Sequence, residues 1–308
     1  MQHLFEVYLE IFLAVRYNNL KADCARRHGE TEREAEAMEH HVSREEFMTL
    51  VRWVKDNYGV NLEQKSTLVE GRLWNVIKQK GFSTLKEYFD YAVADKSGME
   101  IKTLLTRLTT NYTYFMREDQ HYTFLTGTVL PGLIPHLKTK DLRIWSAGCS
   151  SGEEPYTTAM VLDDWFGTQK SQWDAKILAT DISPQVLQMA DEAVYPEDRL
   201  KNLPKAWKNK YFTKEPGEQF RVKPDIKKEV IFRSFNLMEP FPFRKPFHVI
   251  FCRNVMIYFD KPTRDGLIER FYDALEPGGY LFIGLSETVD KMVTRFDFVR
   301  PSIYKRGV

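Results

Sequence analysis

The residues with the clearest chemical potential lie in the sequence IWSAGCSSGEEPY, at positions 144–156. An apolar run leads into Gly148 and Gly152, and Glu153 and Glu154 then precede a proline and an apolar helical period. This order predicts a buried strand, a tight loop that needs positive φ angles, and the first turn of a helix. It is the arrangement that opens a nucleotide-type site in an open α/β sheet.

A second predicted strand, Lys176–Thr180, ends on Asp181, whose carboxylate could accept both hydroxyls of a ribose. The loop lacks the G-x-G-x-x-G pattern of dinucleotide sites, because its two glycines are four residues apart. Glu153 and Glu154 would also repel a phosphate at the helix terminus. These residues favour S-adenosylmethionine, a sulfonium nucleoside without phosphate. A purely structural strand-to-helix turn is the alternative.

Composition sets the outer limits of the interpretation. At 308 residues and 43% hydrophobic, the chain can form two globular domains or one large one. Its net charge of +1, and aromatic residues that are not interleaved with bases, give no indication of nucleic-acid binding. The three cysteines (24, 149 and 252) and His40-His41 lack metal-ligand spacing, so we expect reduced thiols and no metal. The sequence contains no run of about 18 uncharged apolar residues, so it predicts no membrane span.

Residues 1–42 are predicted to be an N-terminal extension, helical or mobile. The apolar stretch 4–15 is interrupted by Glu6 and Glu10 and has no basic region before it, so it is a poor secretory signal. A non-essential extension is the simpler interpretation, and an amphipathic docking helix is the alternative.

Residues 43–110 carry four helical patterns, which predict a small all-helical domain. The first begins at Ser43, where Glu46 completes a capping box, and ends at Gly59. The second spans 62–80, with Leu68 and Leu73 among its inward residues. The other two cover 84–94 and 99–110. The outer face of the second helix carries four bases, which are either a solvated face or a docking surface: Lys65, Arg72, Lys78 and Lys80.

Residues 111–140 are predicted to link this domain to the sheet and to contribute to the cofactor site. They begin with NYTYFMRE (111–118), and the apolar helix that follows is expected to break at Pro131 and Pro135. Without a family argument, Asn111, Thr113 and Arg117 would be ordinary capping and surface residues.

Residues 141–308 contain strand patterns at 142–147, 176–180, 230–235, 247–252, 280–285, 296–299 and 303–306. An antiparallel hairpin around Pro216-Gly217 is expected within 209–232, and residues 277–279 predict a turn. Because ligands bind beyond the carboxyl ends of parallel strands, residues 148, 181, 236 and 254 should meet in one crevice.

Five stretches together resemble the CheR family of chemotaxis-receptor glutamate methyltransferases: IWSAGCSSGEEPY, LATDI, NYTYFMRE, FCRNVMIYFD (251–260) and LEPGGYLFIGLSE (275–287). The resemblance runs from about residue 43 to the C-terminus. It implies a Rossmann-like, seven-stranded α/β class I methyltransferase sheet with a small antiparallel β insert, preceded by a small all-α substrate-docking domain. It also implies S-adenosylmethionine as cofactor, S-adenosylhomocysteine as product, the cytoplasmic methylation helices of chemoreceptors as partners, and a cytoplasmic location.

The same resemblance assigns roles to individual residues. Arg117 and Tyr258 would be catalytic, with Tyr258 near the transferring methyl group, and the four bases of the second helix would dock the receptor. The cofactor-binding residues would be Asn111, Thr113, Arg117, Glu153, Asp181, Asn236, Leu237, Arg253 and Asn254.

One stretch departs from part of the family. The hairpin turn in FTKEPGEQFRV is shorter and poorer in glycine than in members tethered by a receptor-tail pentapeptide, so we expect weak or no pentapeptide binding. A glutamate acceptor with a pKa of about 4.3 is already ionised at pH 7, so its methylation needs alignment and exclusion of water rather than a base. Two alternatives stay open: a small-molecule methyltransferase and a non-catalytic, donor-binding adaptor. For Arg117 the alternative is a salt bridge with Glu118 or Glu153.

Overall fold

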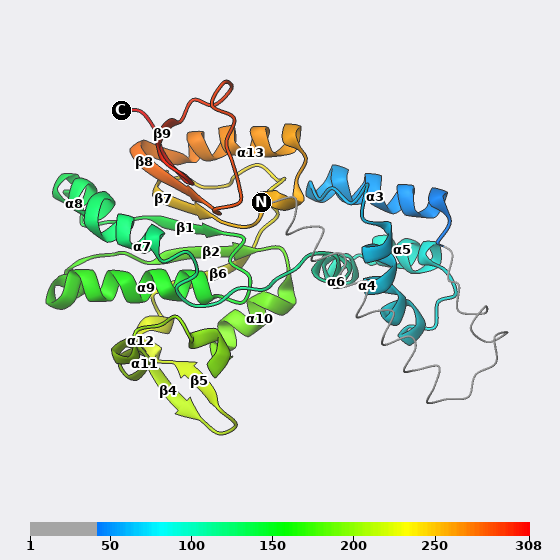
Figure 1. Ribbon diagram of the computed structural model, residues 1–308, viewed down its shortest axis with the longest axis horizontal. Helices are drawn as coiled ribbons and strands as arrows, with labels where there is room; N and C mark the ends of the chain where they lie inside the picture. The colour runs from blue at the N-terminus through cyan, green and yellow to red at the C-terminus, as the bar shows by residue number, and fades with distance from the viewer. Residues whose placement is uncertain (1–41) are drawn as a thin grey trace, which may run out of the picture. The chain divides into compact units, whose positions relative to one another are not determined.

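The computed structural model describes residues 42–308 (Figure 1). The predictions for residues 1–41, including Cys24 and His40-His41, lie outside the described residues. Along this part of the chain, four helices come first, a linker follows, and strands and helices then alternate.

The main sheet has seven strands within residues 42–308. In spatial order they are β6 (Val230–Ser234), β2 (Ile177–Asp181), β1 (Ile144–Ala147), β7 (Phe247–Cys252), β8 (Leu275–Ile283), β10 (Ile303–Lys305) and β9 (Asp297–Arg300). The first five are parallel, and β10 pairs antiparallel with both β8 and β9. From β1 the chain moves through β2 towards β6, and it later returns to the other side of β1 with β7. This reversal of direction places a crevice at the carboxyl end of β1.

Both faces of the sheet are buried, which is why the sequences of its parallel strands are nearly continuous apolar runs. Along β1, Ile144 packs into one core cluster and Trp145 into the other. The first cluster includes side chains of α9 (Glu153–Phe166) and of the linker helices, and the second includes side chains of α13 (Lys261–Ala274). Remaining helices of this part of the chain are α10 (Pro184–Glu192), α11 (Lys205–Tyr211) and α12 (Pro224–Lys227), with short 3₁₀ segments η3 (Gly167–Gln172), η4 (Glu197–Leu200) and η5 (Met256–Tyr258).

The four N-terminal helices group together beside the sheet in Figure 1. They are α3 (Arg44–Tyr58), α4 (Ser66–Gln79), α5 (Leu85–Ala94) and α6 (Met99–Leu108). As predicted, α3 is followed by Gly59, which has a φ of +73° and lies so close to Met238 that a Cβ would be 2.7 Å from its sulfur. Helix α4 begins four residues later than predicted, and Val69 rather than Leu68 is fully buried on its inner face.

The linker helix does not break at Pro131, contrary to the sequence prediction. Helix α7 (Gln120–Phe124) continues through a π-helical turn, η1 (Leu125–Val129), into α8 (Leu130–Leu133) and the 3₁₀ turn η2 (Ile134–His136). In the π turn the N–H of Leu130 bonds to the carbonyl of Leu125, five residues back. This wider turn accommodates the proline ring, which would clash with the carbonyl four residues earlier in a regular α-helix.

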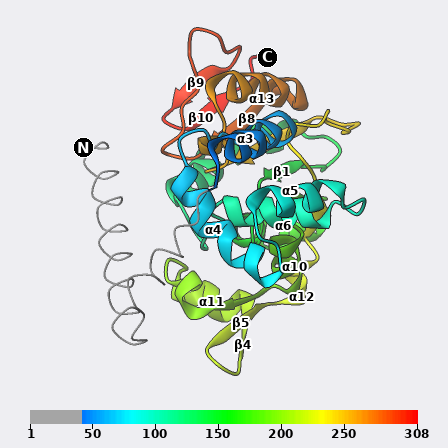
Figure 2. The ribbon, with the colours of Figure 1, turned by 90° about the vertical axis from the view of Figure 1, so that its right-hand side faces the viewer.

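The predicted hairpin is present as β4 (Phe212–Glu215) and β5 (Gln219–Val222). It pairs with a strand that was not predicted, β3 (Val194–Pro196), in a separate three-stranded sheet. Figures 1 and 2 both show the β4–β5 hairpin below the main sheet and β9 at its top. The turn predicted at 277–279 is instead part of β8, where the register with β7 shifts. A β-bulge keeps this glycine-containing segment within the strand.

Hydrogen bonds and an ion pair join the helical domain to the sheet. The amide of Asn236 donates to the carbonyl of Asn57 at 2.9 Å, and the Lys55 ammonium lies 2.9 Å from Asp260. At α6, the Thr106 hydroxyl donates to that of Ser183 at 2.7 Å. These contacts hold the ends of α3 and α6 at the carboxyl edge of the sheet.

The predicted architecture is therefore confirmed: a seven-stranded, mostly parallel α/β sheet with a small antiparallel β insert, preceded by an all-α domain. Within residues 42–308, none of the helices is long and apolar enough to cross a membrane.

Candidate active site

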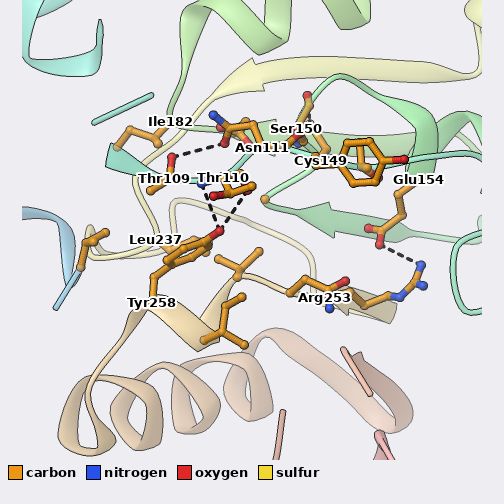
Figure 3. Close-up of a pocket in the computed structure, with 18 of the residues that line it drawn as sticks. Thr109, Thr110, Asn111, Cys149, Ser150, Glu154, Ile182, Leu237, Arg253 and Tyr258 are labelled. Atoms are coloured by element: carbon orange, nitrogen blue, oxygen red, sulfur yellow. Dashed lines mark hydrogen bonds and ion pairs between the residues drawn. The ribbon is translucent and has the colours of Figure 1, made fainter. Parts of the chain in front are cut away.

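A cavity of about 440 Å³ lies at the carboxyl ends of β1, β2 and β7. This volume falls within the range of about 300–1,000 Å³ that is usual for small-molecule sites. Its wall is built from the ends of α3 and α6, the linker, the glycine loop and the segments after β2, β6 and β7. Figure 3 shows side chains from these separate segments converging on one space.

The glycine loop after β1 brings its backbone against neighbouring side chains. Gly148 has a φ of +81°, and a Cβ there would lie 2.4 Å from the Val255 side chain. Gly152, with a φ of +94°, would place a Cβ 2.8 Å from that of Ala190. Any larger residue would strain the backbone and displace a neighbour, which explains both glycines.

The amides of this loop are already used inside the protein. Gly148 and Cys149 both donate to the carbonyl of Thr180, at 2.8 and 2.9 Å, and Ser150 N–H donates to Asp181 at 2.9 Å. A phosphate site needs free backbone N–H groups that point at the ligand. The loop therefore suits a ligand without phosphate, as the sequence predicted.

Asp181 lies at the end of β2 and lines the cavity. Its two carboxylate oxygens accept one backbone N–H each, from Ser150 and Ser183. Each oxygen keeps further acceptor capacity for a ribose hydroxyl. Burial raises the pKa of Asp181 above its ordinary value, although these two hydrogen bonds oppose the shift.

The two loop glutamates have different positions. Glu153 does not line the cavity; it is fully buried, accepts a hydrogen bond from the Ser151 hydroxyl and lies 3.2 Å from Arg199. Glu154 lines the cavity instead and pairs with Arg253 at 3.1 Å (Figure 3). Burial raises the pKa of both carboxyl groups.

The linker supplies Asn111, Thr113 and Arg117 to the cavity wall, as the family resemblance implied. Asn111 is fixed on both sides, because its side-chain amide donates to Thr106 and its carbonyl accepts from the Ser150 hydroxyl.

Arg117 is differently held. Its guanidinium donates to the carbonyl of Tyr112 at 3.0 Å, and within residues 42–308 no carboxylate lies at ion-pair distance from it. Glu118 pairs with Arg253 and Glu153 with Arg199, so the alternative of a salt bridge to either is not what the structure shows.

Segments after β6 and β7 complete the wall with Asn236, Leu237, Arg253 and Asn254. Asn236 is tied to the end of α3 through Asn57. Asn254 has a φ of +60°, an uncommon conformation for a residue other than glycine.

Tyr258 lies on η5 at the junction with the helical domain. Its hydroxyl donates to the carbonyl of Thr110 at 3.0 Å and accepts from the N–H of the same residue at 3.1 Å (Figure 3). Both bonds go to backbone, so in this structure Tyr258 holds the beginning of the linker and shapes the cavity.

A buried charge network beneath the cavity was missed by the sequence analysis. The side chain of Arg253 is 1% exposed and lies 3.2 Å from Glu118 and 3.1 Å from Glu154. It also donates to the carbonyl of Arg117 and to the hydroxyl of Tyr122. The available signal was the presence of acids next to motif residues, in RE (117–118) and EE (153–154), but sequence alone does not show which acid meets the arginine.

The four bases of the second helix are not equally available. Arg72 is half-buried, and its guanidinium donates to the carbonyls of Arg107 and Leu108 and to the Thr110 hydroxyl. Arg72, which was predicted on the outer face, is thus only partly exposed, and its guanidinium supports the end of α6.

The other three bases keep more of their charge towards solvent. Lys80 pairs with Glu100 at 2.8 Å, Lys78 is exposed beside Trp74, and Lys65 lies 5.7 Å from the centre of the Tyr258 ring.

Cys149 and Cys252 are buried, and burial raises the pKa of each thiol well above its ordinary value. An un-ionised buried thiol is a packing residue rather than a nucleophile. Among residues 42–308 no group of three or more histidines, cysteines and acids could hold a metal ion.

Comparison with known families gives two matches that cover most of the chain. Residues 111–304 match the SAM-binding domain of CheR methyltransferases, and residues 45–109 match their all-alpha domain. S-adenosylmethionine is the cofactor of the matched domain. It contains no phosphate, so it fits a cavity whose loop amides are already hydrogen-bonded within the protein.

Several curated proteins are similar over most of their length. A "chemotaxis protein methyltransferase" of Borreliella burgdorferi is 44% identical over 86% of this chain and 95% of its own. A "probable chemotaxis protein methyltransferase" of Rhizobium etli is 37% identical, covering 74% and 86%. The protein of that kind from Escherichia coli is 33% identical, covering 84% and 89%. With this sheet, this cavity and these matches, the chain belongs to the CheR family of S-adenosylmethionine-dependent methyltransferases.

Proposed function

We propose that this protein transfers a methyl group directly from S-adenosylmethionine to glutamate side chains in the cytoplasmic helices of chemoreceptors, forming methyl esters. The names of its relatives support a chemotaxis substrate. An ester of glutamate removes one negative charge from the receptor, which is the kind of change that can adjust a signalling state.

One observation carries the choice of a carboxylate as acceptor. The cavity wall contains two arginines, and Arg253 is neutralised by two buried carboxylates. Arg117 makes one hydrogen bond to a carbonyl and keeps most of its N–H donors. An anionic acceptor would give this guanidinium a charged partner, and the carboxylate at the methionine end of the donor is the other anion that could do so.

The reaction needs little chemical assistance from the protein. When bound, S-adenosylmethionine supplies an electrophilic methyl group on a sulfonium. The acceptor carboxylate, with a pKa of about 4.3, needs no general base at neutral pH. Arg117 would orient the carboxylate through a charge-assisted hydrogen bond, while Tyr258 would hold the adjoining linker and limit water around the reacting atoms.

Asp181, with Asn111, Asn236 and Leu237, would hold the donor. Asp181 has the acceptors for the ribose, and Leu237, which is 9% exposed, offers an apolar surface for the adenine. In our proposal Glu153 supports the glycine loop from below, through Ser151, rather than contacting the donor.

The proposal can be tested with methyl-labelled S-adenosylmethionine and membranes that contain a chemoreceptor. We expect label in the receptor that is released as methanol by mild base, because only an ester is labile in this way. A receptor whose methylation-helix glutamates are replaced by alanine is the matched control. Label in a small molecule, or donor binding without any transfer, would favour one of the two alternative functions.

Receptor docking through α4 is part of the proposal, with a reduced set of residues. Lys65 and Lys78 are the candidates with no carboxylate partner within residues 42–308, whereas Lys80 shares its charge with Glu100. Arg72 is used inside the protein. The electrostatic attraction of this face for an acidic receptor is therefore modest.

We also propose that the protein does not depend on a receptor-tail pentapeptide. The β4–β5 turn has only three residues between its strands, of which Gly217 and Glu218 have positive φ. A turn this short offers little surface to a peptide beyond the edge of β4. Titration calorimetry with such a pentapeptide should detect no binding, and micromolar affinity would contradict the proposal.

A further inference from the structure

The carboxylate of Glu287 is buried in an unusual way. The residue is 6% exposed, and its two oxygens accept backbone N–H groups from Gly284 at 2.6 Å, Asn254 at 2.9 Å and Ile257 at 3.2 Å. Within residues 42–308 no lysine, arginine or histidine lies at ion-pair distance from it. Burying an anion without a cation is costly unless backbone amides replace the lost water.

The segment that Glu287 holds is the one that follows β7. It contains Asn254, which lines the cavity with a positive φ, and leads into Tyr258. The side chain of Val255 fills the space that a Cβ on Gly148 would need. The Tyr258 hydroxyl is bonded to the backbone of Thr110. This single segment therefore touches both the glycine loop and the start of the linker.

Gly284 shows how closely the two segments approach. A Cβ on Gly284 would lie 2.6 Å from the side-chain nitrogen of Asn254 and 2.8 Å from Oε2 of Glu287. Both distances are shorter than van der Waals contact allows, so any residue with a Cβ at position 284 would push the Glu287 carboxylate away from Asn254. We call this arrangement, Glu287 and Gly284 with the amides of Asn254 and Ile257, the Glu287 clasp.

From this geometry we infer that Glu287 is a positioning residue for methyl transfer: its carboxylate fixes residues 254–258, and through them Tyr258, Val255 and the loops that they contact. The inference rests on the proposed function. Glu287 does not line the cavity and touches neither donor nor acceptor space. Its anionic form matters because both oxygens must accept, and an uncharged amide can accept with only one of them.

The test is a double-mutant cycle with Glu287→Gln and Tyr258→Phe. Glu287→Gln keeps the size of the side chain but turns an NH₂ group towards one of the backbone amides. We expect its kcat to fall by roughly 10- to 100-fold, the range that small displacements of positioned groups can produce. In the double variant the losses should not multiply, because both changes release the same contact to Thr110.

Two further variants separate positioning from a general loss of stability. Asp290→Asn removes a carboxylate three residues along, one that pairs with Lys261 at 2.9 Å, and it should leave kcat unchanged. Gly284→Ala disturbs the clasp while keeping the carboxylate, so it should reproduce the effect of Glu287→Gln. Folding of each variant is checked by its thermal unfolding midpoint.

Three results would overturn the inference: multiplied losses in the double variant, an equal loss in Asp290→Asn, or unchanged turnover in Tyr258→Phe. If the wild-type protein forms no ester at all, the proposed function fails separately. In that case calorimetry with S-adenosylhomocysteine tests the Glu287 clasp, because the clasp holds Val255 against Gly148 in the donor-binding loop. Weaker binding by Glu287→Gln would support the positioning role of Glu287, and unchanged binding would refute it.

Discussion

Two arginines in the same cavity show how surroundings decide what a residue can do. Arg253 has a side chain that is 1% exposed, and two carboxylates and a carbonyl use its donors, so it has little left for a substrate. Arg117 has one carbonyl partner and no carboxylate at ion-pair distance within residues 42–308. The structure therefore gives Arg253 a supporting position and leaves Arg117 available to an anion.

Replacing Arg117 with alanine tests this difference. We expect Arg117→Ala to lower kcat by roughly 100-fold, because the acceptor carboxylate loses its orienting partner. The affinity for S-adenosylhomocysteine, measured by calorimetry, should change much less. Arg117→Lys keeps the charge but not the planar fork, so its kcat should lie between those of the wild type and Arg117→Ala. Unchanged turnover in Arg117→Ala would remove this residue from the reaction.

The buried carboxylate of Asp181 predicts a pH dependence of donor binding. Burial raises the pKa of Asp181 above its ordinary value of 3.8. As the pH falls through this raised pKa, the carboxylate gains a proton and loses acceptor capacity for the ribose hydroxyls. Affinity for S-adenosylhomocysteine should therefore weaken on the acid side at a higher pH than an ordinary aspartate would produce.

Calorimetry between pH 4 and pH 8 measures this effect, and Asp181→Asn is the control. The amide cannot titrate, so the variant should bind more weakly at neutral pH and show a flatter profile. A wild-type profile that matches that of Asp181→Asn would show that the carboxylate does not hold the donor.

At this scale the sequence predicted residue types better than residue partners. Gly148 and Asp181 could be predicted because a glycine after a strand and an acid at a strand end are local patterns. Glu154 could not be distinguished from Glu153, because adjacent residues at a helix start point in different directions and only the packed structure shows which one faces the cavity. The role of Glu287 depends on a contact with residues 30 or more positions away.

The network around Arg253 is the main connection between elements at the site. It joins the linker at Glu118, the first turn of α9 at Glu154 and the end of β7, three segments that are far apart in the sequence. Helix α7 is held to the same arginine through the hydroxyl of Tyr122. Cavity shape therefore depends on a cluster of one arginine and two carboxylates that is largely excluded from water.

Removing this arginine should be strongly destabilising. We expect Arg253→Met to lower the free energy of unfolding by about 3–5 kcal/mol, because two carboxylates are left buried without a cation. Arg295→Met is the matched control: its side chain is 47% exposed and pairs with Glu269 and Asp273, so the loss should be about 1 kcal/mol or less.

The same variant should respond to pH in a defined direction. Burial already raises the pKa of Glu154 above its ordinary value of 4.5, and loss of the neighbouring cation raises it further. Since a protonated carboxyl needs no cation, the deficit in unfolding free energy should be largest at neutral pH and shrink as the pH falls through that pKa. Urea unfolding at several pH values measures it, and a constant deficit would contradict this explanation.

Elements were predicted well where a local pattern decides them and poorly where packing does. Strand β7 was predicted over its full length, because a continuous apolar run bounded by polar residues is a local signal. Strand β3 has only three residues and exists because β5 pairs with it. The π turn before Pro131 is likewise a response to surroundings, since the buried side chains of Leu125 and Val129 keep the linker helix continuous.

At the scale of the whole described chain, the cavity belongs to both parts of the fold. Tyr58 and Leu105 of the helical domain line it together with residues of the sheet domain. The contacts of Asn57, Lys55 and Thr106 with the sheet domain set the distance between these walls. A helix of a receptor that docks on the helical domain would thus be held next to the opening where Arg117 is available.

Charge reversal on α4 tests this coupling of docking to catalysis. Lys78 is exposed beside the Trp74 ring and has no carboxylate at ion-pair distance within residues 42–308, so Lys78→Glu should leave the fold and the cavity intact. We expect the KM for the receptor to rise by up to about fivefold at low salt, since an exposed charge contact is worth about 1 kcal/mol or less. The kcat should stay unchanged, and added salt should reduce the difference because it screens the contact.

The control for this experiment is Lys138→Glu, which makes the same change in charge at an exposed position outside the helical domain. If both variants raise KM equally, net charge and not docking on α4 is responsible. If Lys78→Glu lowers kcat instead, α4 acts on the cavity rather than on the receptor. A selective, salt-sensitive rise in KM would support docking of the receptor on this face of α4.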